Sequence, residues 1–250
     1  MPVHRFAEMT WEEVRDADLG RAVAILPVGA VEAHGPHLPL GTDVVIAEGM
    51  ARSCGHALSD AGRTAFILPP MWYTAAAFAR AFPGTVSVAP DTVRATVTQI
   101  AEALGAQEIG ILAIANAHLD PVHLASLQEA AGVAAPPSSA RIVFLDLTRR
   151  HVAERLTDEF RTGACHAGRF EGSIVLAEAP EQVRSGIAAK LEPVPASLSD
   201  AIREGKRSFE EAGGERAYFG WPADATAEEG RASVETLGSL LAALVLEAEE

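Results

Sequence analysis

Short apolar runs alternate with amphipathic stretches along the 250 residues of the chain. The runs are bounded by glycine, proline or polar residues, which predicts strands at residues 22–28, 64–69, 108–116 and 141–146. The stretches between them have helical spacing, which predicts helices at residues 9–14, 44–55, 90–104, 123–131 and 148–160, and a last helix after Gly230. This alternation favours an α/β fold with a largely parallel central sheet.

Polar residues stand at two of the predicted helix starts. Thr10 and Glu13 have the spacing of a capping box. Asp43 precedes the helical pattern of residues 44–55, where the helix dipole favours a carboxylate. As a cap Asp43 would contribute about 1 kcal/mol, and a cap and a metal ligand do not exclude each other.

Composition and charge limit the classes of partner. Hydrophobic residues make up 48% and charged residues 22% of the chain, which is ordinary for a globular protein. A net charge of −14 argues against a nucleic acid or an anionic membrane surface as partner. Two cysteines are too few for a disulfide framework, and no secretory signal is visible, so we expect a cytoplasmic location. The apolar stretch 237–246 is typical of a packing or subunit-interface helix.

We expect one domain over residues 1–250, because no internal repeat or boundary is visible. The Pro- and Ser-containing segment 134–139 is a predicted surface turn, too short for a domain linker, and residues 187–198 look irregular. Single-domain size is sufficient to bury a sizeable core.

The candidate chemistry begins in the segment from Glu32 to Asp43, which directly follows the first predicted strand. Glu32 and His34 are two residues apart and therefore point to one side of an extended backbone. Asp43 follows a Pro- and Gly-rich loop that can fold back. Carboxylates and imidazoles that converge at a strand end suit zinc, manganese or iron.

Two later segments have the same character. His118 and Asp120 follow the predicted strand 108–116, and sites in open α/β sheets form outside the carboxyl ends of strands. His166 and Glu171 lie in a Gly-containing segment farther on. Asp146, at the end of the strand 141–146, is a weaker candidate.

Four motifs in these segments resemble the creatininase (creatinine amidohydrolase) family. The first is the string from Leu26 to Asp43, with Glu-Ala-His-Gly-Pro-His-Leu-Pro-Leu-Gly-Thr-Asp at its end. The others are Phe-Pro-Gly-Thr at 82–85 with Asn-Ala-His at 116–118, His-Ala-Gly at 166–168 with Glu171, and the closing segment 220–230. The chain departs from the family at Phe78-Ala79, where Glu-His is common, at Leu119-Asp120, and at Cys165.

The resemblance implies a three-layer α/β/α sandwich with a mostly parallel sheet, and a centre of two divalent metal ions (Zn, Mn or Fe). It implies that Asp43 bridges the ions, that Glu32 and His118 complete one site, and that His34 and Glu171 complete the other. His166 would carry the proton from water to the leaving nitrogen, while Asp120 would hold a second water. Direct ligation by Asp120 in place of Glu171 is the competing arrangement.

The remaining histidines and aromatics have lesser predicted roles. His37 is expected to hydrogen-bond a ligand or the loop backbone, and His4, His56, His123 and His151 are interpreted as surface or packing residues. Trp72, Tyr73 and Phe78 line the substrate pocket or belong to the core. Cys165 is expected to act as a small hydrophobe rather than as a nucleophile.

The leading functional prediction is a dinuclear metal-dependent amidohydrolase that cleaves a C–N bond of a small cyclic amide, formamide or related non-peptide amide. The alternatives are a peptidase of the same family that acts on a short peptide, and a catalytically silent metal-binding or assembly subunit. The family resemblance also implies a homo-oligomer, with a hexamer among the expected forms.

Overall fold

A five-stranded sheet forms the centre of the protein. The structure, a computed structural model, describes residues 3–132 and 138–248, and all strand pairs of the sheet that it describes are parallel. The strand order is β1-β3-β2-β4-β5, and the strands are β1 (Val3–Arg5), β2 (Ala22–Val28), β3 (Thr64–Ile67), β4 (Ile111–Asn116) and β5 (Arg141–Phe144).

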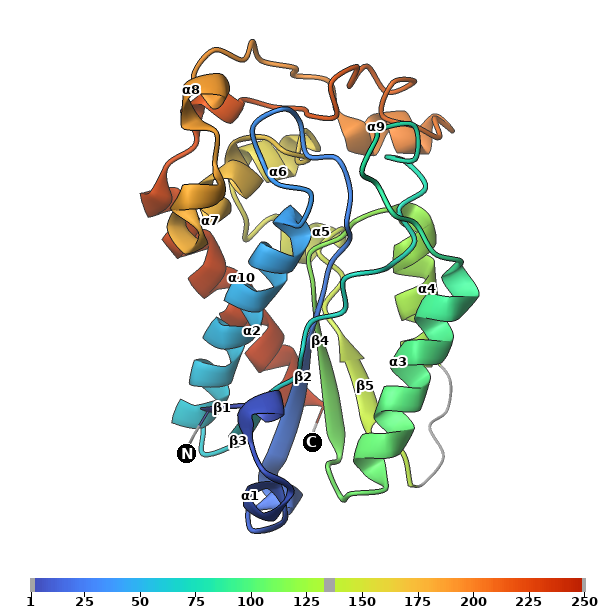
Figure 1. The fold of residues 1–250 in the computed structure, drawn as a ribbon, viewed down its shortest axis with the longest axis vertical. Coiled ribbons are helices and arrows are strands. Elements are labelled where there is room, and N and C mark those ends of the chain that lie inside the picture. Colours follow the sequence, from blue (N-terminus) through green and yellow to red (C-terminus); the bar gives the residue numbers. More distant parts are fainter. Residues whose placement is uncertain (1–2, 133–137, 249–250) are drawn as a thin grey trace.

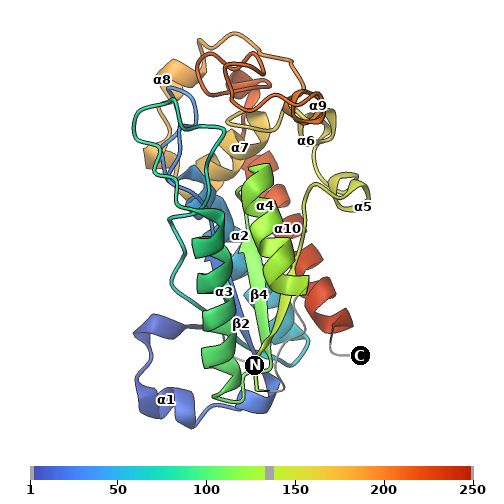
Figure 2. The same cartoon turned by 90° about the vertical axis from the view of Figure 1, so that its right-hand side faces the viewer.

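Helices cover both faces of the sheet (Figures 1 and 2). One layer contains α2 (Thr42–Asp60), α7 (Arg169–Glu178) and α10 (Ala227–Glu247), and the other contains α3 (Pro90–Gly105) and α4 (Pro121–Gly132). This arrangement confirms the predicted three-layer α/β/α sandwich with a mostly parallel sheet.

The side chains of β2 show how the sheet joins its two helical layers. Val23 and Ile25 pack in the core beneath α2 and α10, whereas Ala24 and Leu26 pack in the core beneath α3 and α4. Successive residues of a strand point to opposite faces, and all seven residues of β2 are buried. A strand buried on both faces is apolar throughout, which explains its uninterrupted run.

The longest helices follow the predicted pattern, with differences at their ends. Helix α2 continues through Gly55 to Asp60. The missing side chain of Gly55 leaves room for Val3 of the edge strand β1, which would lie 3.1 Å from a Cβ atom there. Helix α10 buries Leu237 and Leu241 completely and packs against α2 and α7, so its apolar stretch serves internal packing. No helix within the described residues is long and apolar enough to cross a membrane.

One helical prediction is wrong. The stretch 148–160 contains two short helices, α5 (Arg150–Ala153) and α6 (Asp158–Thr162), instead of one. Thr157 interrupts the helix because its side chain caps α6 by accepting a hydrogen bond from the backbone of Phe160. By contrast, the capping box of Thr10 and Glu13 is confirmed at the start of α1 (Trp11–Arg15).

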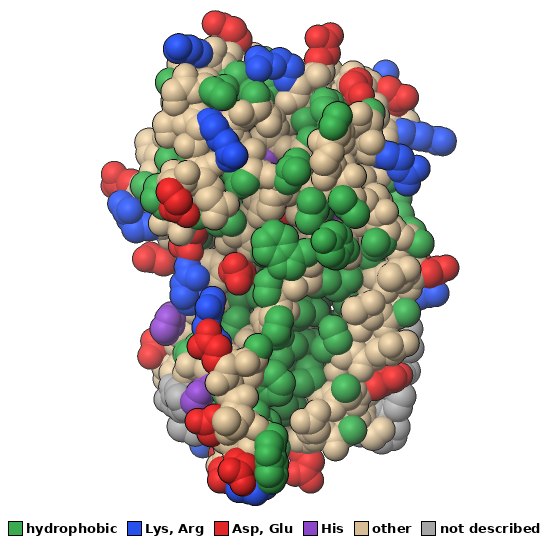
Figure 3. Space-filling model, viewed as in Figure 1, with side chains coloured by type: hydrophobic (Ala, Val, Ile, Leu, Met, Phe, Trp, Pro, Cys, Tyr) green, Lys and Arg blue, Asp and Glu red, His purple; other side chains and the backbone are tan. Residues whose placement is uncertain are grey.

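Irregular segments and short helices gather beyond the carboxyl ends of the strands, at the top of Figure 1. They include α8 (Ser185–Ala188) and α9 (Leu198–Arg203). An isolated bridge joins Val194, in the predicted irregular stretch, to Gly220 farther along the chain. Most of the predicted turn 134–139 lies outside the described residues. Hydrophobic side chains gather near the middle of the face in Figure 3, with charged side chains around its edge.

Candidate metal centre

The candidate site lies where two neighbouring strands end. Val28 of β2 pairs with Asn116 of β4, so the loop after β2 and the segment after β4 start side by side. The first turn of α2 approaches the same point, since a Cβ atom on Gly29 would lie 2.6 Å from the backbone nitrogen of Val44. A glycine is therefore required there. This convergence brings Glu32, His34, Asp43 and His118 to one place.

Hydrogen bonds fix the loop that carries Glu32 and His34. The backbone N–H of Ala33, which lies between these two residues, donates to Oγ1 of Thr85 at 3.1 Å. Just before Glu32, the carbonyl of Val31 accepts the N–H of Val86 at 2.8 Å. Thr85 is the last residue of the Phe-Pro-Gly-Thr motif, so this motif holds the loop in position.

Asp43 is shared by two groups of potential metal ligands. Its Oδ1 lies 3.1 Å from Nε2 of His34, and its Oδ2 lies 3.1 Å from Nδ1 of His118. Glu32 completes the group around His118 at 3.2 Å, and Glu171 completes the group around His34 at 3.7 Å. In each group the three ligand atoms lie within 4.8 Å of one another. The structure thus brings together all five residues predicted to hold metal.

Asp43 differs in one respect from its predicted place. It lies in the first turn of α2, and the N-cap is Gly41. Its carboxylate accepts a hydrogen bond from the backbone of Ala30 at 3.2 Å and faces the two imidazoles. The carboxylate of Asp43 therefore faces the ligand cluster near the positive end of the helix dipole, and it does not act as the N-cap.

The two imidazoles are oriented by backbone carbonyls. His34 Nδ1 lies 3.1 Å from the carbonyl of Glu32, and His118 Nε2 lies 2.9 Å from the carbonyl of Ala75. A ring nitrogen that donates to a carbonyl leaves the other nitrogen as a lone-pair ligand. These other nitrogens, Nε2 of His34 and Nδ1 of His118, are buried and make no hydrogen bond of good geometry. They are the nitrogens that face the carboxylates.

The buried carboxylates favour positive charge in the site. Burial opposes protonation of His34, but Asp43, Glu171 and Glu32 outweigh it and raise the pKa of His34 to about 10. The pKa of His118 is also raised against the effect of burial, chiefly by Glu32 and Asp43. Burial and the neighbouring carboxylate of Asp43 raise the pKa of Glu171 to about 8. The protonated imidazoles thus provide the positive charge that divalent cations would otherwise provide.

His166 is placed beside these groups but is held neutral. Its Nε2 lies 2.9 Å from the carbonyl of Ala33, and its Nδ1 lies 4.0 Å from Oε1 of Glu32. Burial and the charge of His34 lower the pKa of His166 well below its ordinary value. A neutral ring whose free nitrogen faces the cluster can accept a proton. It also forms a third potential ligand group with Glu32 and His34.

Asp120 stands apart from the ligand groups. Its Oδ1 accepts the backbone N–H of Val122, at the start of α4, and its Oδ2 accepts that of Phe78, both at 2.9 Å. Asp120 lines the cavity next to the cluster, yet its carboxylate already ties the loop that carries Phe78 to α4. Among the described residues Glu171, not Asp120, lies within a potential ligand group.

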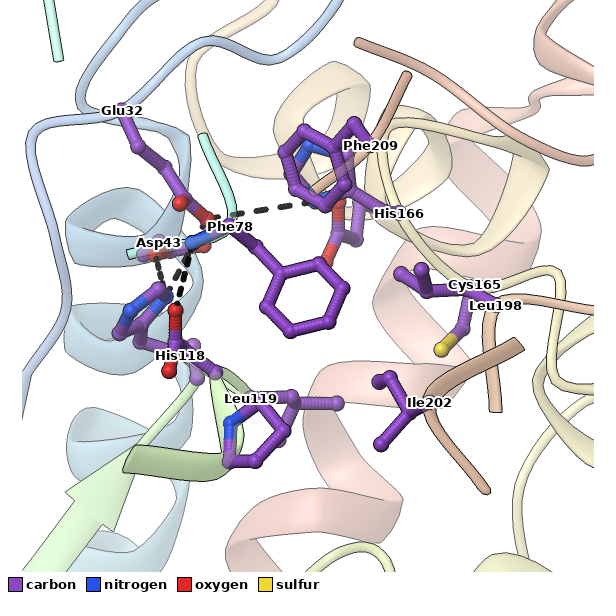
Figure 4. A pocket seen from close by; sticks show the side chains of 14 residues that line it. Glu32, Asp43, Phe78, His118, Leu119, Cys165, His166, Leu198, Ile202 and Phe209 are labelled. Carbon is purple, nitrogen blue, oxygen red and sulfur yellow. Dashed lines mark hydrogen bonds and ion pairs between the residues drawn. The ribbon is translucent and has the colours of Figure 1, made fainter. Parts of the chain in front are cut away.

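The cavity beside the cluster is small and partly apolar (Figure 4). It has a volume of about 40 Å³, room for a few ions or water molecules, since one water needs about 10–15 Å³. Four of the five proposed ligands (all but His34), His166 and Asp120 line it together with Phe78, Ala117, Leu119, Pro121, Cys165, Leu198, Ile202 and Phe209. Trp72 and Tyr73 do not line it and are 43% and 57% exposed.

Burial raises the pKa of the Cys165 thiol to about 12. A thiolate nucleophile requires a lowered pKa, so this value agrees with the predicted role of Cys165 as a small hydrophobe. His37 is buried against Tyr218, with ring centroids 6.2 Å apart. Neither of its ring nitrogens makes a hydrogen bond of good geometry, and the backbone of Ala167 is the backbone group that interacts with its ring.

Sequence reasoning missed two buried residues that support the site. His123, interpreted as a surface or packing residue, contacts Oδ1 of Asn116 through Nε2 at 2.9 Å, and Asn116 donates to the carbonyl of His118 at 2.7 Å. Glu159 accepts the backbone N–H groups of Arg169, Phe170 and Trp221 at 2.6–2.8 Å. No sequence motif around Glu159 indicates this role, because the three N–H groups that it accepts come from other segments of the chain.

Comparisons with known proteins show the relatives of this chain. The family described as Creatininase, creatinine amidohydrolase, matches residues 7–245. The mycofactocin precursor peptide peptidase of Mycobacterium tuberculosis (strain CDC 1551 / Oshkosh) is 29% identical over 214 residues, 83% of this chain and 78% of that protein. The protein of the same name from Mycolicibacterium smegmatis is 43% identical over 67 residues, 26% of this chain and 27% of that protein.

Solved structures share the fold. A putative creatinine amidohydrolase from Bacteroides fragilis has a TM-score of 0.73 at 23% identity, covering 96% of this chain and 94% of that one. Two creatininase structures described as "Creatininase Mn" and as a "Zn-Zn type" mutant have TM-scores of 0.70 and 0.68, with 22% identity and at least 96% of each chain covered. Because the family match spans nearly the whole chain, the protein belongs to the creatininase family.

Proposed function

We propose that the protein is a hydrolase of amide C–N bonds that uses two divalent metal ions. The observation that carries this proposal is the pair of three-residue ligand groups that share Asp43, each with a buried imidazole nitrogen free of a good hydrogen bond. Three carboxylates and two imidazoles are a donor set that suits such ions. Glu32 and His118 would hold one ion, His34 and Glu171 the other, with Asp43 between them.

The metal ions would acidify a water molecule and polarise the amide carbonyl. His166 would accept the proton of that water at Nδ1 and pass it to the leaving nitrogen, as a neutral imidazole is able to do. Its bond to the carbonyl of Ala33 keeps the free nitrogen toward the cluster. Asp120 would act by fixing the loop of Phe78 over the cavity, a positioning role in place of the predicted water-holding one.

Zinc and manganese are the proposed metals. Two related creatininase structures are described with Zn or Mn, and carboxylate and imidazole ligands suit both. The charge balance also favours two ions, because Glu32, Asp43 and Glu171 bring three negative charges to oppose four positive ones.

A short peptide is the favoured substrate, ahead of the small cyclic amide or formamide that the sequence suggested first. The relatives aligned over most of the chain are named as peptidases of a precursor peptide. The Pseudomonas putida creatinine amidohydrolase is similar over a shorter stretch, 28% identical across 45% of this chain. A catalytically silent subunit is disfavoured by the complete set of potential ligands.

The proposal is tested with protein stripped of metal and reloaded with Zn²⁺ or Mn²⁺. We expect metal-dependent turnover of at least one substrate in a panel of creatinine, formamides and peptides of two to six residues. His166→Ala should retain two ions per chain and lose about 10²–10⁴-fold in turnover, whereas His56→Ala, on the exposed side of α2, should match the native protein.

Two results would contradict this scheme. A chain that binds two ions yet hydrolyses no member of the panel would support the non-catalytic alternative. Native turnover in His166→Ala would remove His166 from the reaction.

A further inference from the structure

The cavity at the ligand cluster shares a wall with a second, much larger cavity. The inner cavity is about 40 Å³ and the outer one about 720 Å³. Five residues line both, namely Leu119, Pro121, Cys165, Leu198 and Ile202. In Figure 4 the labelled members of this set lie across the cavity from Glu32 and Asp43, beyond Phe78. The outer cavity therefore adjoins the site on the side away from the ligands.

The outer cavity is a groove between α4, α5, α6 and α9. Near the shared wall it is apolar, with Leu124 and Phe160 beside Leu198 and Ile202. Ala125 of α4 lines the groove and is exposed, so the groove opens to solvent. A volume of several hundred Å³ is that of a site for a ligand much larger than a small cyclic amide.

Most of the charged side chains that line the groove are arginines. Arg150, Arg161 and Arg203 line it together with a single acid, Asp200, although the net charge of the whole chain is −14. Each arginine pairs with an acid at the surface, and exposed pairs are weak. Because each arginine has an acidic partner, the charges nearly balance, and it is the apolar wall that favours a ligand with an apolar group near the ions.

We propose that this groove binds the peptide chain on one side of the amide bond that is cleaved, with an apolar side chain against Leu119, Leu198 and Ile202. This inference rests on the proposed function, because it assigns the substrate class of the same site. The large volume and the apolar wall shared with the ligand site are the observations that support a peptide.

The test measures binding, not turnover, so that it is independent of the catalytic proposal. The probe is a fluorescein-labelled hexapeptide with leucine at its two central positions, followed by fluorescence anisotropy with competition by the unlabelled peptide. The protein is the full chain loaded with Zn²⁺, and the anisotropy is read directly after mixing, before the peptide is hydrolysed. Ala125→Trp adds bulk to the groove from an exposed helix position, and Ala103→Trp, at an exposed position of α3 outside the groove, is the matched control.

We expect the native protein and Ala103→Trp to bind the peptide equally, and Ala125→Trp to bind it at least about tenfold more weakly. A hexapeptide with lysine at the two central positions should also bind at least about tenfold more weakly. Absence of binding, equal binding by Ala125→Trp, or equal binding of the two peptides would overturn the proposal. Tight binding that Ala125→Trp weakens, without any hydrolysis, would uphold the groove and refute the proposed reaction.

Discussion

Asp43→Asn gives the sharpest test of the shared carboxylate. The substitution keeps the shape of the side chain and one oxygen that can accept the N–H of Ala30. It removes the charge that lies 3.1 Å from both His34 and His118. Asp43 belongs to both proposed ligand groups. Its neutralisation should therefore weaken the binding of both ions, whereas loss of any other proposed ligand should weaken the binding of one ion.

The expected size follows from the burial of the site. Removing one member of a buried, paired set of charges costs about 3–5 kcal/mol, and each 1.4 kcal/mol is about a factor of ten in affinity. Metal affinity should therefore fall by about 10²–10⁴ at both positions. Asp146→Asn is the control, since Asp146 is a buried carboxylate that bonds Gln128 and Thr148 instead of the cluster.

The assay is metal content by mass spectrometry after dialysis, combined with competition against a chelator of known affinity. We expect two ions per chain in the native protein and in Asp146→Asn, and nearly none in Asp43→Asn. Retention of two ions by Asp43→Asn at native affinity would refute the bridging role. Loss of one ion alone would show that Asp43 serves a single site.

Three further outcomes are expected. His118→Ala should keep one ion per chain, because the group around His34 lacks His118; loss of both would contradict two separable sites. Glu159→Ala should lower stability by about 3 kcal/mol, since three buried N–H groups lose their acceptor, and unchanged thermal unfolding would contradict this. Folded, metal-free protein retains protons on His34, with a pKa of about 10 instead of 6.5, and on Glu171, with about 8 instead of 4.5. Its stability should therefore fall as pH rises, from about 4.5 to 8 through Glu171 and from about 6.5 to 10 through His34. Bound metal should abolish this fall, because metal ligands are already deprotonated. Melting curves recorded with and without chelator test this expectation.

The sequence by itself determined the layers of the fold and the candidate ligands. The strand β2 is apolar throughout because both of its faces are buried, and such a run is visible without coordinates. The ligand residues were visible because they stand in four motifs that resemble the creatininase family in the same order, whereas a single pair of an acid and a histidine would have been weak evidence. Glu32 and His34 share a side of the chain through local geometry alone, with site atoms 3.9 Å apart.

Only the tertiary structure decided which of the distant residues join the ligand cluster and which support it. Glu171 and Asp120 are both acids near predicted strand or helix ends, and their local sequences leave open which one belongs to the cluster. The backbone donors of Phe78 and Val122 engage Asp120, and these donors are brought to it by the fold. Likewise, Glu159 gains its three N–H partners, and the groove gains its wall of Leu198 and Ile202, only when segments far apart in the chain pack together. Hydrogen bonds and cavities of this kind depend on long-range contacts, which periodicity and spacing do not encode.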